Sequence, residues 1–125
     1  MISIGIWFIF LAVVIHVYIW VLESFLWTKP KTTKLFGISH KDAVVSKQLA
    51  FNQGFYNLFL AIMTAIGAFT FLVGHVDVGY ALLVAGTGSM IFAGLLLLLT
   101  DRTKRRAALV QFVAPAIGIV LIALG

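Results

Sequence analysis

Two residues with acid/base chemistry lie seven positions apart in a long apolar stretch. His16 carries an imidazole that titrates near neutral pH and Glu23 carries a carboxyl group, and such a pair can move a proton in an isomerisation or a hydrolysis. Seven residues make two helical turns, so both side chains share one helix face about 10 Å apart along its axis. Our working hypothesis is that His16 and Glu23 are catalytic, since an ionisable group in an apolar helix is costly. A core histidine satisfied by its own hydrogen bonds is the alternative for His16.

A second polar group interrupts another apolar stretch, in the sequence FNQGFYN at 51–57. At about 100° per residue, its three carboxamides and its phenol form one polar face about 140° wide. The last apolar stretch adds a further carboxamide, and a tryptophan lies close to the His16/Glu23 face. Such groups either bind the polar part of a ligand or join helices through hydrogen bonds of about 0.6 kcal/mol each. The residues that we predict to bind a ligand are Asn52, Gln53, Tyr56, Asn57, Gln111 and Trp20.

Several kinds of site find no support in the sequence. The chain has no cysteine, which excludes disulfides, thiolate metal sites and thiol nucleophiles. One histidine and one carboxylate within the apolar stretches make a poor set of metal ligands. A glycine-rich phosphate loop, a GxSxG elbow and an HExxH motif are all missing. We therefore expect neither a metal nor a cofactor.

The composition is that of an integral membrane protein. Of its 125 residues, 62% are hydrophobic and only 10% are charged. The mean hydropathy is +1.13. A membrane span needs about 20 mainly apolar residues. Four stretches meet this requirement, which predicts one transmembrane domain over residues 1–125, an all-α four-helix bundle with helices at about 3–27, 49–73, 78–100 and 107–124.

The basic residues predict the orientation of these spans. All nine lie in two connections, five between residues 28 and 48 and four between 101 and 106. The positive-inside rule places both loops in the cytoplasm and both termini outside, in a multi-pass protein of the cell (inner, cytoplasmic) membrane. The net charge of +5 then needs no nucleic-acid partner, because basic loops fix topology and contact anionic lipid headgroups of the bilayer. Ser39 and Asp42 have the spacing of a helix N-cap, so a helix could begin near His40.

The predicted depths in the membrane place the polar side chains of three helices at one level. With the second helix running opposite to the first, Asn52 and Gln53 lie at about the depth of Glu23, some 6 Å inside the cytoplasmic end. Gln111 in the last helix lies at the same level. Since polar groups avoid lipid, we predict a polar pocket in the cytoplasmic half of the bundle. Small residues at every fourth position from Ala81 to Ala93 indicate close helix packing, within the chain or with a second copy in a homo-oligomer.

Three blocks of the sequence resemble a known family. They are HVYIWVLESFLW at 16–27, FNQGFYNLFLA at 51–61, and the basic turn before a glutamine-bearing last helix. The chain resembles a widespread family of small bacterial four-helix membrane proteins of unknown function, often automatically labelled "epimerase". The resemblance covers essentially the whole chain, and the NQGxYN block is its most specific part. It implies the fold and implicates the predicted site residues by position, but it implies no activity, and the Rossmann fingerprint of soluble sugar epimerases is missing.

Three functions are compatible with these patterns. The favoured one is a pocket that binds, and by acid/base chemistry could transform, a lipophilic small molecule or lipid with a polar head. The second is a proton-coupled exporter that uses Glu23, as in the small multidrug-resistance transporters. The third is a structural or accessory subunit in which the polar groups only set helix register. Whether the protein is an enzyme stays open at this point.

Overall fold

The protein is an all-α bundle of four long helices. The computed structural model describes residues 1–125. Its long helices are α1 (Ile2–Phe25), α4 (Lys47–Leu72), α5 (Val76–Thr100) and α6 (Arg105–Leu124), joined by the short helices α2 (Pro30–Phe36) and α3 (His40–Val45) and the 3-10 turn η1 (Arg102–Lys104). The chain contains four helices that are long and apolar enough to cross a membrane. The predicted fold class, an all-α membrane four-helix bundle, is confirmed.

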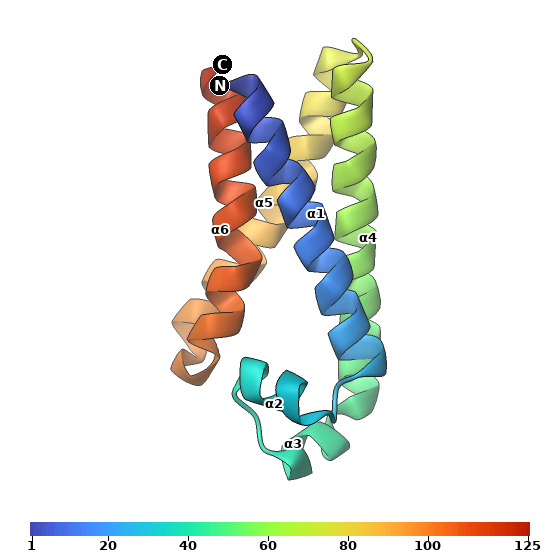
Figure 1. The fold of residues 1–125 in the computed structure, drawn as a ribbon, viewed down its shortest axis with the longest axis vertical. Coiled ribbons are helices and arrows are strands. Elements are labelled where there is room, and N and C mark those ends of the chain that lie inside the picture. Colours follow the sequence, from blue (N-terminus) through green and yellow to red (C-terminus); the bar gives the residue numbers. More distant parts are fainter.

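The long helices alternate in direction around the bundle. α1 packs against α4 and α6, and α5 packs against the same two helices. Both termini lie at one end, whereas α2 and α3 lie at the other, beside the basic residues (Figure 1). We call the end that carries α2, α3 and η1 the basic end. There the α1/α4 pair and the α5/α6 pair diverge (Figure 1).

The half of the bundle away from the basic end is closely packed. A Cβ added at Gly5 of α1 would lie 3.0 Å from the carbonyl oxygen of Gly118 in α6. A Cβ added at Gly67 of α4 would lie 2.9 Å from the backbone nitrogen of Leu83 in α5. Glycine at these two positions therefore lets neighbouring helices approach closely.

The small-residue stripe of α5 does not make these contacts. Ala81, Ala85, Ser89 and Ala93 are all exposed on the surface of the bundle. The buried positions of α5 include Gly86 and Gly94, which pack against Thr64 of α4 and Phe112 of α6. Of the two alternatives for the stripe, packing within the chain does not apply, because α5 is rotated so that its glycines face inward.

Short elements cover the basic end. Pro30 occupies the first turn of α2, where its missing N–H is not needed. Gly37 ends α2 in the left-handed conformation, with φ +65°. Ser39 caps α3 through a hydrogen bond of 3.1 Å from the backbone N–H of Asp42, as the sequence predicted. These breaks turn the chain back across the diverging helices before α4 begins.

Candidate functional site

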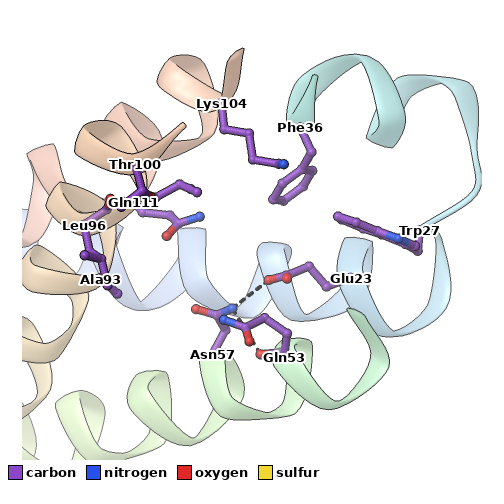
Figure 2. Close-up of a pocket in the computed structure, with 11 residues that line it drawn as sticks. Glu23, Trp27, Phe36, Gln53, Asn57, Ala93, Leu96, Thr100, Lys104 and Gln111 are labelled. Atoms are coloured by element: carbon purple, nitrogen blue, oxygen red, sulfur yellow. Dashed lines mark hydrogen bonds between the residues drawn. The ribbon is translucent and has the colours of Figure 1, made fainter. Parts of the chain in front are cut away.

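A cavity of about 370 Å³ lies at the basic end. All four long helices, α2 and η1 contribute to its wall, so it lies where the two helix pairs diverge (Figure 2). Its lining combines carboxyl, amide and ammonium groups with aromatic and aliphatic side chains. The lining residues are Glu23, Trp27, Phe36, Gln53, Asn57, Ala93, Leu96, Leu97, Thr100, Lys104 and Gln111.

A hydrogen bond between α1 and α4 forms one wall of the cavity. The Asn57 amide Nδ2 donates to the Glu23 Oε1 at 2.6 Å (Figure 2). Glu23 is 6% exposed and Asn57 8% exposed, so this pair is buried. The same Nδ2 also donates to the backbone oxygen of Gln53 at 3.2 Å. The second carboxyl oxygen of Glu23 makes no hydrogen bond within the protein, which leaves it free for a molecule in the cavity.

The opposite wall presents a carboxamide that has no partner. Gln111 of α6 is 9% exposed, and its side chain makes no hydrogen bond to the protein. Its amide points toward the side of the cavity that carries Glu23 and Asn57 (Figure 2). The side chain of Gln53 likewise has no hydrogen bond, although Gln53 lies at the exposed edge of the cavity. A carboxamide can donate two hydrogen bonds and accept two, so Gln111 and Gln53 offer unused binding capacity.

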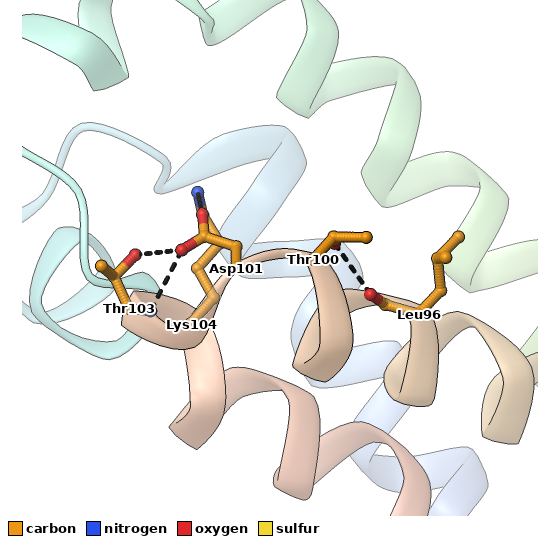
Figure 3. A network of polar contacts seen from close by, with 5 residues as sticks. All are labelled: Leu96, Thr100, Asp101, Thr103 and Lys104. Carbon is orange, nitrogen blue, oxygen red and sulfur yellow. Dashed lines mark hydrogen bonds and ion pairs between the residues drawn. The ribbon is translucent and has the colours of Figure 1, made fainter.

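Lys104 adds a positive charge to the lining. Asp101, between α5 and η1, accepts hydrogen bonds from the Thr103 backbone N–H at 3.0 Å and from the Thr103 hydroxyl at 2.5 Å (Figure 3). Its other oxygen accepts from the Lys104 Nζ at 2.9 Å. The Thr103 hydroxyl and then the Lys104 ammonium lower the pKa of Asp101 below its ordinary value. Asp101 thus holds the Lys104 side chain beside the cavity.

The apolar part of the lining closes one side of the cavity. Trp27 and Phe36 meet edge to face with ring centroids 5.0 Å apart. Phe36 of α2 also packs in a buried cluster with Ile19 and Leu22 of α1 and Ala107 of α6. This cluster fills the space between α1 and α6 at the basic end.

No comparable cluster fills the side of the cavity between α4 and α5. Leu96 of α5 lines the cavity and is 63% exposed. Gln53 of α4 and Ala93 and Thr100 of α5 are also exposed while lining it. The cavity is therefore open laterally, toward the surface that a bilayer would cover.

Comparison with known proteins assigns the chain to a family. Residues 10–123 match the family described as "Protein of unknown function (DUF1304)". The chain belongs to this family. The resemblance to a family of unknown function is thereby confirmed for nearly the whole chain. No curated protein and no solved structure matches it.

In this DUF1304 member, Asn52 and Tyr56 lie away from the cavity. Both are exposed and line a shallow groove on the outside of α4 together with three phenylalanines. The reason is Gly54, where a Cβ would lie 3.0 Å from the Trp20 carbonyl oxygen, so this side of α4 faces α1. Two residues before or after Gly54 correspond to about 200° of rotation, which turns both side chains outward. The prediction that Asn52 and Tyr56 line the same pocket as Glu23 is wrong.

Trp20 and His16 also lie outside the lining of the cavity. Trp20 packs edge to face against Phe25 and Phe55, with ring centroids 5.5 and 5.7 Å away. Buried His16 has its Nδ1 2.8 Å from the carbonyl oxygen of Ala12. Because a carbonyl only accepts, Nδ1 carries the proton and Nε2 is the basic nitrogen of the neutral ring. The catalytic roles of His16 and Glu23 stay predictions.

The part of the lining that lies nearest the basic end was not predicted from the sequence. Lys104 belongs to a basic turn that was interpreted only as a topology signal, and Trp27, Phe36 and Thr100 were not among the predicted site residues. The spacing of Asp101 and Lys104 was the available signal for the lysine, because an N-cap aspartate can pair with a lysine three residues later.

Proposed function

We propose that the cavity binds an amphipathic small molecule or lipid. Its polar head would lie between Gln111 and the Glu23/Asn57 pair, and its apolar part would leave between α4 and α5. The observation that carries this proposal is the Gln111 side chain, which is buried in the cavity wall and has no hydrogen-bond partner in the protein.

This arrangement favours a ligand over hydrogen bonding that only joins helices. A joining role would pair the carboxyl and amide side chains with one another, and of the four that line the cavity only Glu23 and Asn57 are paired. A bound head group would use the free hydrogen-bonding capacity of Gln111, of Gln53 and of the second oxygen of Glu23.

The mixture of side chains indicates the chemistry of the head group. Lys104 can donate to a phosphate, carboxylate or carbonyl oxygen, whereas Glu23 can accept from a hydroxyl or an ammonium group. A head group with both acceptors and donors fits this lining best. A volume of about 370 Å³ lies in the usual range of small-molecule sites.

The lateral opening supports entry from the membrane. Phe36 and its neighbours in α1 and α6 close the opposite side, while exposed Leu96 borders the side between α4 and α5. A lipophilic molecule could therefore enter the cavity laterally, between α4 and α5, while its tail remains in the bilayer. Close packing in the other half of the bundle argues against a path to the far side, so we favour binding over export.

Binding is better supported than turnover. Glu23 is the carboxyl group that contacts the cavity, and it could exchange a proton with a bound head group. His16 lies two helical turns deeper and outside the lining, so the acid/base pair suggested by the sequence is not assembled around the cavity. We therefore propose a binding protein in which Glu23 recognises a donor group of its ligand.

Mass spectrometry of the molecules that co-purify with the protein tests this function. The variants Gln53→Leu and Gln111→Leu should each lose a specific amphipathic molecule that the wild type retains after detergent washing. Asn52→Leu is the matched control, because it removes a neighbouring carboxamide of α4 that lies outside the cavity. Identical sets of bound molecules in all four proteins would refute the proposal.

For the membrane, we propose the cell membrane with the basic end in the cytoplasm. The chain has no cysteine, so a single cysteine introduced at His75 or at Arg102 reports on one side only. A membrane-impermeant maleimide should label intact cells at position 75 and not at position 102. Labelling at position 102 and not at position 75 would show that the basic end lies outside the cell and would refute the proposed orientation.

A further inference from the structure

A second groove lies on the outer surface of α1, where α2 begins. It has a volume of about 570 Å³ and is separate from the cavity, with which it shares no lining residue. Tyr18 and Leu22 of α1 form its apolar wall together with Leu26, which directly follows the helix. Its other end carries Lys29, Lys31 and Thr32. The groove thus changes from apolar to basic along the helix axis.

The polar end contains a threonine, Thr32, whose hydroxyl has no partner in the protein. Thr32 is 1% exposed, and its hydroxyl makes no hydrogen bond within the protein. The neighbouring Thr33 shows the usual solution for this residue type, with its hydroxyl donating to the Pro30 carbonyl oxygen at 3.1 Å. Since Thr32 lines the groove, its hydroxyl is placed to donate to a molecule bound there.

The two lysines have no acidic partner. The one ion pair in the protein joins Lys104 to Asp101, and no acidic side chain lines the groove. Lys29 and Lys31 are exposed at the basic end, at the level where lipid headgroups would lie. The groove is therefore complementary to an anion with a hydrophobic tail, one that runs from the headgroup level toward the midplane.

We propose that this groove binds one anionic glycerophospholipid. Its phosphate would lie between the two lysines and accept from the Thr32 hydroxyl. One acyl chain would follow α1 over Leu26 and Leu22 to Tyr18, about 12 Å deeper along the helix. A second copy of the chain fits less well, because it would bring its own lysines to the same membrane face and leave both sets of charges unpaired.

Spin-labelled lipids test this site. The protein is reconstituted in phosphatidylcholine vesicles that contain a trace of spin-labelled phosphatidylglycerol or spin-labelled phosphatidylcholine. The motionally restricted fraction of each label gives its relative association with the protein. We expect the wild type to select phosphatidylglycerol, and Lys29→Gln/Lys31→Gln to lower this selectivity by up to about fivefold for each lysine at low salt. Thr32→Val, which keeps the shape of the side chain, should lower it as well.

Two controls separate a built site from a general charge effect. Lys34→Gln/Lys41→Gln removes the same charge from the same loop, but from positions outside the groove, and it should keep the selectivity. Equal losses in the two double variants, or no selectivity in the wild type, would overturn the proposal. Gln111→Leu should leave the lipid selectivity unchanged. The lipid site in the groove is therefore tested independently of the ligand proposed for the cavity.

Discussion

The hydrogen bond between Asn57 and Glu23 allows a quantitative test of how the cavity wall is held. Both residues are more than nine-tenths buried, and the Nδ2–Oε1 distance is 2.6 Å. Asn57→Leu leaves the Glu23 oxygen without its donor, and Glu23→Leu leaves the Asn57 amide without its acceptor. A buried unsatisfied group costs about 1–3 kcal/mol, whereas interhelical hydrogen bonds in membranes average about 0.6 and reach about 1.7 kcal/mol.

The structure places the expected loss of unfolding free energy where these two ranges overlap. The short distance and the burial favour the upper values, while the adjacent cavity can supply water to an abandoned group and so favours the lower ones. We expect each single variant to lose about 1–2 kcal/mol. The double variant Glu23→Leu/Asn57→Leu should lose little more than one single variant, because replacing both partners leaves no unsatisfied group.

Reversible unfolding by sodium dodecyl sulfate in mixed micelles, followed by far-ultraviolet circular dichroism, measures these differences. The double-mutant cycle isolates the pair term. If the losses of unfolding free energy in the two single variants sum to the loss in the double variant within about 0.5 kcal/mol, Asn57 and Glu23 do not stabilise the bundle through each other. The hydrogen bond would then have no part in holding the wall.

Two further perturbations test the packing and the charges around the site. Gly54→Ala should lower the unfolding temperature markedly, because the new Cβ would meet the backbone of α1. Gly88→Ala is the control and should leave the unfolding temperature unchanged, because a Cβ at this position meets open space. Equal decreases in the two variants would contradict the packing of α4 against α1. Because the pKa of Asp101 is lowered on folding, its carboxylate contributes stability that is fully present above the ordinary pKa of 3.8 and disappears as the pH falls through the lower folded value. Thr103→Val should raise that folded pKa toward 3.8, as read from the carboxyl carbon signal in a nuclear magnetic resonance titration; an unchanged value would refute the assignment to the Thr103 hydroxyl.

The four spans and the cap of α3 could be predicted from the sequence because their signals are local. An apolar stretch of 20 or more residues indicates a membrane helix by length alone. The N-cap at Ser39 depends on one hydrogen bond across three residues.

The rotation of the helices was harder to predict. The polar face of residues 52–57 is too wide to point entirely inward, and helical phase alone does not say which half does. The close contact of Gly54 with α1 decides this, bringing Gln53 and Asn57 to the cavity and turning Asn52 and Tyr56 outward. On α5, glycines beside the small-residue stripe made the inward contacts instead of the stripe.

The cover of the cavity could not be read from the sequence either. Residues 30–36 form a short helix in a polar loop, with too few residues for a clear periodic pattern. Phe36 reaches the cavity because Gly37 turns the chain back and Trp27, Ile19 and Leu22 provide a place for its ring. Such long-range contacts follow from tertiary packing.

The central claim is that the cavity between Glu23 and Gln111 holds a ligand, and an experimental structure of the protein in lipid nanodiscs at high resolution tests it most directly. We expect elongated density that contacts the Gln111 amide and the free oxygen of Glu23 and that leaves between α4 and α5. A collapsed cavity in which Gln111 bonds to Gln53 or Asn57, or one filled only by separate waters, would contradict it.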